Sequence, residues 1–157
     1  MKPSPVFCEI PYGSEAYRAE CELRQAVLRL PLGLSLYEED LGAEATQLHF
    51  GLFETDTLLA CIIANPVSSS EVKLRQMAVS PNHQGRGYGH LLLKKLETEL
   101  SDRGYTAATL HARASAIDFY RKAGFKSFGS EFMEIGIPHQ QMVKHFSGKA
   151  QPIQDLS

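Results

Sequence analysis

The chain has 157 residues, of which 43% are hydrophobic and 22% charged, and its formal net charge is -2. These values are typical of one globular domain with a sizeable core, and they give no electrostatic argument for a nucleic-acid or membrane-surface partner. Cys8, Cys21 and Cys61 stand singly in apolar surroundings, so we expect buried thiols in a reducing compartment. The sequence predicts no signal peptide and no membrane span, which favours a cytoplasmic location.

Hydrophobic periodicity and turn residues predict alternating strands and helices. We expect, in chain order, a strand over residues 6–10, a helix over 14–30, strands over 46–53, 58–64 and 71–79, a helix over 88–103, a strand over 106–112, a short helix over 116–123, and strands over 126–135 and 142–146. Ser14 and Ser115 are expected to cap helix N-termini, and Gly104 and Gly124 to end helices. The order predicts a mixed α/β (α+β) domain over residues 1–146 with its middle three strands antiparallel, followed by a polar tail over 147–157.

A glycine-rich turn lies between the central strand and the long helix that follows it. Gly85, Gly87 and Gly89 allow unusual backbone dihedrals and a close approach to a ligand. Backbone N–H groups at a helix N-terminus, together with the positive end of the helix dipole, suit a phosphate. His90 and Leu91 replace the Lys-Ser/Thr that a P-loop requires, and the GxGxG spacing departs from the GxGxxG dinucleotide fingerprint. The turn therefore predicts a phosphorylated cofactor of another class.

Two motifs identify the class by resemblance. The run from Gln84 to Gly89, after a strand that ends in Met77-Ala78-Val79, matches a Q/R-x-x-G-x-G/A signature, and Ala116 to Tyr120 with Gly124-Phe125 follows at the expected distance. In both respects the chain resembles the GNAT acetyltransferases, and its run from Glu134 to His139 is similar to their ElaA-like branch. The resemblance implies the GNAT fold, with a mostly antiparallel sheet of six or seven strands, a splayed strand pair and about four flanking helices.

The resemblance also implies acetyl-CoA as the donor. In the family, the glycine turn holds the coenzyme pyrophosphate and a bulged central strand pairs with the pantetheine arm, while asparagine often stands where this chain has Arg113. The residues implied in cofactor binding are Met77, Ala78, Val79, Gln84, Gly85, Arg86, Gly87, Tyr88, Gly89, Arg113 and Ser115. Arg113 is expected to reach a coenzyme phosphate or an acidic acceptor.

Acyl transfer to an amine requires a base, an oxyanion donor and a group that stabilises the departing thiolate. A backbone N–H near Ala78 is the expected oxyanion donor. The resemblance implies that Tyr120 stabilises the departing thiolate, as a hydrogen-bond donor or as an acid. The alternative is that Tyr120 only packs at the helix–sheet interface. Lys73 stands where some relatives have a catalytic glutamate, so Glu71 and His111 are the remaining candidates for the base.

Other features of the sequence leave alternatives open. Glu134 and His139 flank the last hairpin, where they could bind an acceptor, relay a proton or only stabilise the turn. The acidic cluster Glu38, Glu39 and Asp40 could attract a cationic amine or simply be solvated. No two histidines or cysteines stand at ligand spacing on one element, so no metal is expected.

The sequence therefore predicts an N-acetyltransferase that uses acetyl-CoA and acts by direct attack of a primary amine. The acceptor is expected to be a small-molecule or a protein amine, with no nucleic-acid or membrane partner, and a homodimer is left open. The alternative is an acyl-CoA-binding or sensing module with little or no turnover.

Overall fold

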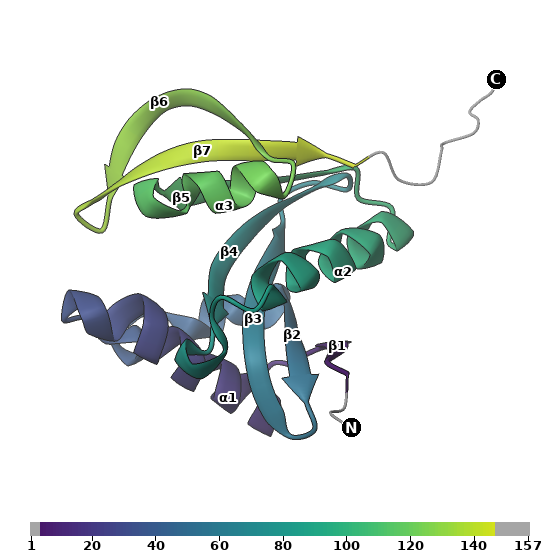
Figure 1. Cartoon of the computed structure of the whole chain (residues 1–157), viewed down its shortest axis with the longest axis vertical. Coiled ribbons are helices and arrows are strands. Elements are labelled where there is room, and N and C mark those ends of the chain that lie inside the picture. Colours follow the sequence, from purple (N-terminus) through teal and green to yellow (C-terminus); the bar gives the residue numbers. More distant parts are fainter. Residues whose placement is uncertain (1–3, 147–157) are drawn as a thin grey trace. The chain divides into compact units, whose positions relative to one another are not determined.

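Seven strands form one mixed sheet in the order β1-β2-β3-β4-β5-β7-β6 in the computed structural model, which describes residues 4–146 (Figure 1). The strands are β1 (Val6–Glu9), β2 (Leu48–Glu54), β3 (Thr57–Pro66), β4 (Glu71–Val79), β5 (Ala107–Arg113), β6 (Lys126–Glu134) and β7 (Ile137–His145). The helices are α1 (Glu15–Arg24), α2 (Tyr88–Asp102) and α3 (Ile117–Lys122). Shorter helical turns are η1 (Gln25–Arg29), η2 (Leu30–Leu32), η3 (Leu36–Glu38), η4 (Leu41–Thr46), η5 (Pro81–His83) and η6 (Ala114–Ala116).

The contacts divide the chain into two compact units. The first unit comprises described residues 4–65 and 75–95, and the second comprises residues 66–74 and 96–146. Both β4 and α2 contribute residues to each unit, because the divisions fall after Leu74 and after Lys95. The expected order of strands and helices is confirmed, and the expected mixed α/β fold with it.

The helical region of the first unit begins and ends at residues that the sequence marks. Ser14 is the N-cap of α1, and its side chain accepts a hydrogen bond from the Tyr17 N–H. The helix does not stop at Arg24 but passes through the π-helical η1 into η2. Gly33, at φ 73°, ends it in the left-handed conformation that favours glycine.

The core of the first unit lies on β2, β3 and the start of α2. Antiparallel pairing of β2 with β3 places Phe50 opposite Ile62, and both side chains are fully buried. Leu92 and Leu93 of α2 are buried as well. These apolar side chains of the helix are therefore on its packed face.

The second unit is built on β5, which pairs with strands on both sides. The residues Glu71–Leu74 of β4 pair with β5 in parallel, and β7 pairs with it antiparallel from Ala107 to Arg113. β6 and β7 form an antiparallel hairpin and run side by side in Figure 1. The tip of the hairpin is Ile135-Gly136, at φ 53° and 71°, since Glu134 pairs with Ile137. Two left-handed central residues make this a tight primed turn.

Three expectations from the sequence are wrong in detail. β7 begins at Ile137 rather than at residue 142, because the two-residue turn leads directly into the strand and Pro138 can pair opposite Met133 there. Ser115 lies within η6, and Ala116 stands at the N-cap of α3 without a side-chain bond. Cys8 is exposed, since β1 is at the edge of the sheet, whereas Cys21 and Cys61 are buried.

Among the described residues, no helix combines the length and the apolar composition that crossing a bilayer requires. The tail predicted over residues 147–157 lies outside the described residues.

Candidate functional site

The glycine turn of the first unit lies on the surface directly before α2. Residues 84–87 are exposed, and Gly85 and Gly87 take φ values of 78° and 84°. A side chain at either position would enter open space, so the left-handed backbone rather than crowding selects glycine there. The turn is thus an accessible backbone surface at a helix N-terminus.

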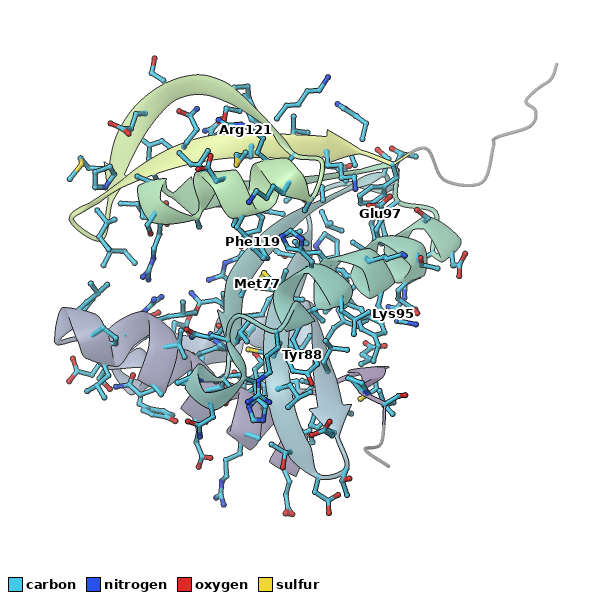
Figure 2. The ribbon with its side chains drawn as sticks, viewed as in Figure 1. Met77, Tyr88, Lys95, Glu97, Phe119 and Arg121 are labelled. Carbon is cyan, nitrogen blue, oxygen red and sulfur yellow. The ribbon has the colours of Figure 1, made fainter. Side chains whose placement is uncertain are left out.

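The first intrahelical hydrogen bond of α2 runs from the Leu91 N–H to the Gly87 carbonyl. The N–H groups of Tyr88 and Gly89 precede that bond, and such amides point outward from a helix N-terminus. Figure 2 shows Tyr88 at this first turn. The side chain of Gln84 donates to the Val79 carbonyl at 3.0 Å and so ties the turn to the end of β4. This arrangement can bind an anion such as a diphosphate.

The backbone of β4 changes direction at Gln76, whose φ is 57°. A left-handed residue that is not glycine interrupts an extended strand, as in a β-bulge. Arg24 Nε donates to the Gln76 side-chain oxygen at 3.3 Å, which helps to fix this position. The bulge that the resemblance implies in the central strand is therefore present as an irregular residue immediately before Met77.

The amides beyond the bulge point alternately to the two edges of β4. The Ser80 N–H donates to the Leu59 carbonyl of β3, and the Ala78 N–H lies near the Cys61 sulfur of the same strand. Because N–H groups alternate along a strand, those of Met77 and Val79 point away from β3. The N–H groups of Met77 and Val79 are therefore better candidates for the expected oxyanion donor than the N–H of Ala78. Ala78 itself is 3% exposed and packs against Cys61 and Leu23.

Tyr120 lies on α3 in the second unit and is half-buried between aromatic rings. Its ring centroid is 5.0 Å from that of Phe119 and 5.8 Å from that of Phe125. Burial raises the pKa of Tyr120 to about 12, although the positive charge of Arg113 acts in the opposite direction. The phenol is therefore neutral near pH 7, so that its O–H is a hydrogen-bond donor.

His111, Glu134 and His139 converge on one face of the second unit. The His111 Nδ1 is 2.9 Å from a Glu134 carboxylate oxygen, and the His139 Nε2 is 3.9 Å from the other oxygen. Burial raises the pKa of the Glu134 carboxyl, but the hydrogen bond and charge of His111, with the charges of His139 and Lys73, lower it more. The side chain of Glu134 is therefore ionised and can only accept the bond from His111.

The other residues expected at the site lie at element ends. Arg113 ends β5 opposite His139, and Ser115 is exposed in η6. Glu71 begins β4, and its N–H donates to the Ser68 hydroxyl at 3.1 Å. The second unit thus contains Tyr120, His111, Arg113, Ser115 and Glu71, and the first contains the glycine turn and residues 77–79.

The acidic cluster of residues 38–40 has structural partners. Arg29 forms an ion pair with Glu39 at 2.6 Å, and Asp40 accepts the Gly42 N–H at the start of η4. Two of its three carboxylates are therefore engaged within the first unit.

A buried charged network in the first unit was missed by the sequence analysis. Arg24 pairs with Glu20 at 2.8 Å and also contacts both oxygens of Glu44, and the His49 Nδ1 lies 2.9 Å from Glu20. The side chains of Glu20 and Arg24 are fully buried. The signal was available, because Glu20 and Arg24 stand four residues apart beside the apolar positions of α1.

Ligand atoms of Glu20, Glu44 and His49 lie within 4.8 Å of one another, which is close enough to hold a metal ion. No single element of the sequence shows metal-ligand spacing, but these three residues come from three elements: α1, η4 and β2. However, Arg24 donates hydrogen bonds to both carboxylates, and the His49 Nε2 faces the Glu44 carbonyl at 3.0 Å. Burial lowers the pKa of His49, but Glu20 and Glu44 outweigh burial and raise it. The chemistry of the cluster therefore fits a polar network in which Arg24 and His49 are the partners of the two carboxylates.

Comparison with known proteins identifies the family. The model of the family described as "Acetyltransferase (GNAT) domain" matches residues 34–146, which include parts of both units. The chain is 37% identical over 73 residues to the uncharacterized N-acetyltransferase YjcF of Bacillus subtilis, a match that covers 46% of this chain and 52% of the relative. The chain thus spans about half the length of this curated relative.

Solved structures share the fold over nearly their whole length. Escherichia coli ElaA is 21% identical with a TM-score of 0.77, covering 90% of this chain and 99% of ElaA. An aminoglycoside 6′-N-acetyltransferase complexed with coenzyme A is 16% identical with a TM-score of 0.74, and the match covers 93% of this chain and 99% of that enzyme. At these identities the likeness shows the fold alone. With the family match over residues 34–146, it confirms the resemblance found in the sequence: the chain belongs to the GNAT acetyltransferase family.

Proposed function

We propose that the chain is an N-acetyltransferase that transfers the acetyl group of acetyl-CoA directly to a primary amine. The observation that carries the proposal is the exposed glycine turn before α2, with Gly85 and Gly87 left-handed, in a chain of the GNAT family. A relative of the same fold was crystallised with coenzyme A, which supports this choice of cofactor.

In the proposed complex, the amides of residues 84–89 hold the coenzyme pyrophosphate. The outward amides of Met77 and Val79 bond to the pantetheine arm, as an added strand would. The side chains of Arg86 and Arg113 carry charges suited to the coenzyme phosphates, and the Ser115 hydroxyl is a further polar contact.

The proposed chemistry uses a backbone amide and a phenol. A Met77 or Val79 N–H stabilises the oxyanion of the tetrahedral intermediate. Tyr120 donates a hydrogen bond to the departing thiolate. With a pKa of about 12, the phenol is a weak acid toward a thiol, whose ordinary pKa is about 8.5, so proton transfer would be uphill by roughly 5 kcal/mol. Tyr120 therefore acts as a donor rather than as an acid.

For the base we favour His111 over Glu71. The amide and side chain of Glu71 belong to the turn at the start of β4, six residues before Met77, which is about 20 Å along an extended strand. His111 is the residue after Leu110, the last of the β5 residues that pair with Glu71–Leu74 of β4. Its imidazole is a quarter exposed and can reach a substrate.

The acceptor is proposed only as a primary amine, on a small molecule or a protein. A single domain over residues 1–146, a cytoplasmic location and action without a metal also remain predictions.

An acetyl-transfer assay tests the proposal directly. Acetyl-CoA binding is measured by calorimetry, and thiol release is then followed with spermidine, kanamycin, L-lysine and a peptide with a free N-terminus. Binding together with amine-dependent thiol release and an acetylated product supports the enzyme. Binding without acetylation of any of these amines favours the alternative, an acyl-CoA-binding module, and absence of binding contradicts both.

A further inference from the structure

The His111–Glu134 pair fixes which nitrogen of His111 faces outward. A carboxylate can only accept a hydrogen bond, so the proton between the two residues belongs to the His111 Nδ1, 2.9 Å from Glu134. In the neutral imidazole the lone pair is then on Nε2. Among the residues that the structure describes, none forms a hydrogen bond with that Nε2. The ring therefore presents its basic nitrogen outward.

Packing holds the ring in this orientation. The Phe132 ring meets the His111 ring edge-on with centroids 4.9 Å apart, and the Phe132 ring also stacks with the His139 ring at 5.9 Å. His139 is buried at 4% exposure, and its Nδ1 donates to the Ile137 carbonyl at 2.8 Å. Its remaining nitrogen, Nε2, faces the second Glu134 oxygen. Both oxygens of Glu134 are thus directed at imidazole rings.

The side chains of His111, Glu134 and His139 come from the three strands β5, β6 and β7, and the strand register places them on one face of the sheet. Arg113 of β5 and Phe132 of β6 lie opposite His139 of β7, and His111 shares the face of Arg113 two residues earlier. Lys73 contributes a further positive charge near Glu134. The carboxylate therefore stays ionised in a positively charged setting, as an orienting group for a catalytic histidine must.

We propose that Glu134 is a positioning residue that holds His111 as the general base of the amine, with Phe132 and His139 fixing the pair. This inference rests on the proposed acetyltransferase function. In the step, an alkylammonium loses one proton to the His111 Nε2, which becomes an imidazolium stabilised by Glu134. The amine nitrogen then attacks the thioester carbon, and the C–S bond breaks when the intermediate collapses. The second nitrogen proton goes to the coenzyme thiolate, and His111 releases its proton to water.

The test compares four proteins of full length: the wild type, His111→Gln, Glu134→Gln and the control Glu97→Gln. The control removes an ion pair of the same unit, Lys144–Glu97 at 2.6 Å, whose side chains are similarly exposed. For each protein, the kcat/KM of the best amine from the panel is measured from pH 6 to 10, along with acetyl-CoA affinity and the thermal midpoint.

We expect His111→Gln to lower kcat/KM at pH 7 by roughly 10²- to 10³-fold, and Glu134→Gln by about tenfold or more, with acetyl-CoA affinity unchanged. The His111→Gln deficit should shrink above about pH 9, where more of the amine is already deprotonated. Nitrogen-15 spectra should show the wild-type His111 protonated on Nδ1 when neutral.

Activity of His111→Gln equal to that of the wild type at every pH overturns the assignment. A Glu134→Gln profile that matches Glu97→Gln, or a deficit in His111→Gln that does not depend on pH, reduces the pair to a structural contact and also overturns it. If the wild type acetylates an amine and His111→Gln does so with the same kcat/KM, only this inference is overturned. If the wild type acetylates no amine, the proposed function is overturned as well.

Discussion

At the scale of single residues, the backbone conformation of Gly87 is the property on which the proposed cofactor binding depends. Its φ of 84° is in the left-handed region, and its Cβ position is open. A larger residue there would strain the backbone by about 1–2 kcal/mol and project into the space where the pyrophosphate is proposed to lie. The effects on stability and on binding can therefore be separated. Backbone strain is expected at any left-handed glycine, whereas obstruction of the proposed pyrophosphate site is particular to Gly87.

Gly87→Leu is expected to reduce acetyl-CoA affinity by at least about 100-fold in calorimetry while the chain stays folded, because the side chain occupies the anion site. Gly13→Leu is the matched control, since Gly13 has φ 81°, also meets open space and lies in the same unit. Equal affinity in the two variants would show that the turn does not bind the coenzyme.

The role proposed for Tyr120 depends on its O–H group alone. Tyr120→Phe keeps the ring packing against Phe119 and Phe125 and removes the donor. A hydrogen bond to a charged group contributes about 1.5–3 kcal/mol, so kcat should fall roughly 10- to 100-fold with acetyl-CoA affinity unchanged. Tyr105→Phe, at another half-buried tyrosine of the second unit, should leave kcat at the wild-type value. If both variants turn over equally, Tyr120 has no part in the reaction.

At the scale of elements, α1 is joined to β2, η4 and β4 by its two buried charges. Glu20 reaches His49 of β2, and Arg24 reaches Glu44 of η4 and Gln76 of β4. Burial raises the pKa of Glu44, yet Arg24 outweighs burial and keeps it low. Removing one member of such a network leaves an uncompensated buried charge.

Arg24→Met is expected to lower the free energy of unfolding by about 3–5 kcal/mol in urea denaturation, since Glu20 and Glu44 would lose their cation. Arg103→Met is the matched control. Arg103 forms the same i,i+4 pair with Glu99 at 2.8 Å, but both side chains are about a third exposed, so its loss should be about 0.5 kcal/mol or less. Similar losses in the two variants would contradict a stabilising role for the buried network.

At the scale of the whole molecule, the residues proposed to bind acetyl-CoA are divided between the two units. The glycine turn and residues 77–79 belong to the first, and Tyr120, Arg113 and Ser115 belong to the second. A ligand that binds only the folded chain stabilises it by mass action, by about 2.7 kcal/mol at 100 times its dissociation constant. The distribution of that stabilisation reports which unit contacts the ligand.

Coenzyme A is expected to slow amide hydrogen exchange in the turn at residues 84–89 and in α3, because each contains residues proposed to bind it. The nucleotide part alone, 3′-phospho-ADP, should protect the turn but not residues 77–79, since it lacks the pantetheine arm. Protection by coenzyme A confined to the first unit would contradict a role for Tyr120 beside the thioester.

Most of the element order could be predicted because local signals determine it. Ser14 and Gly104 mark helix ends through their own local preferences, and the structure places helix ends at both. The start of β7 was missed, because it depends on Ile135, a branched residue in a left-handed turn that only pairing with the neighbouring strand imposes.

The features of the candidate site are likewise of two kinds: those that a local run of sequence determines and those that only tertiary contacts create. The sequence by itself determined the glycine turn and the family, because a phosphate loop is a contiguous run whose chemistry lies in its own backbone. Only the tertiary structure decided that His111, Glu134 and His139 meet on one face and that Glu20, Arg24, Glu44 and His49 form one network. Those contacts join residues far apart in the chain through strand register and packing, which no local pattern encodes.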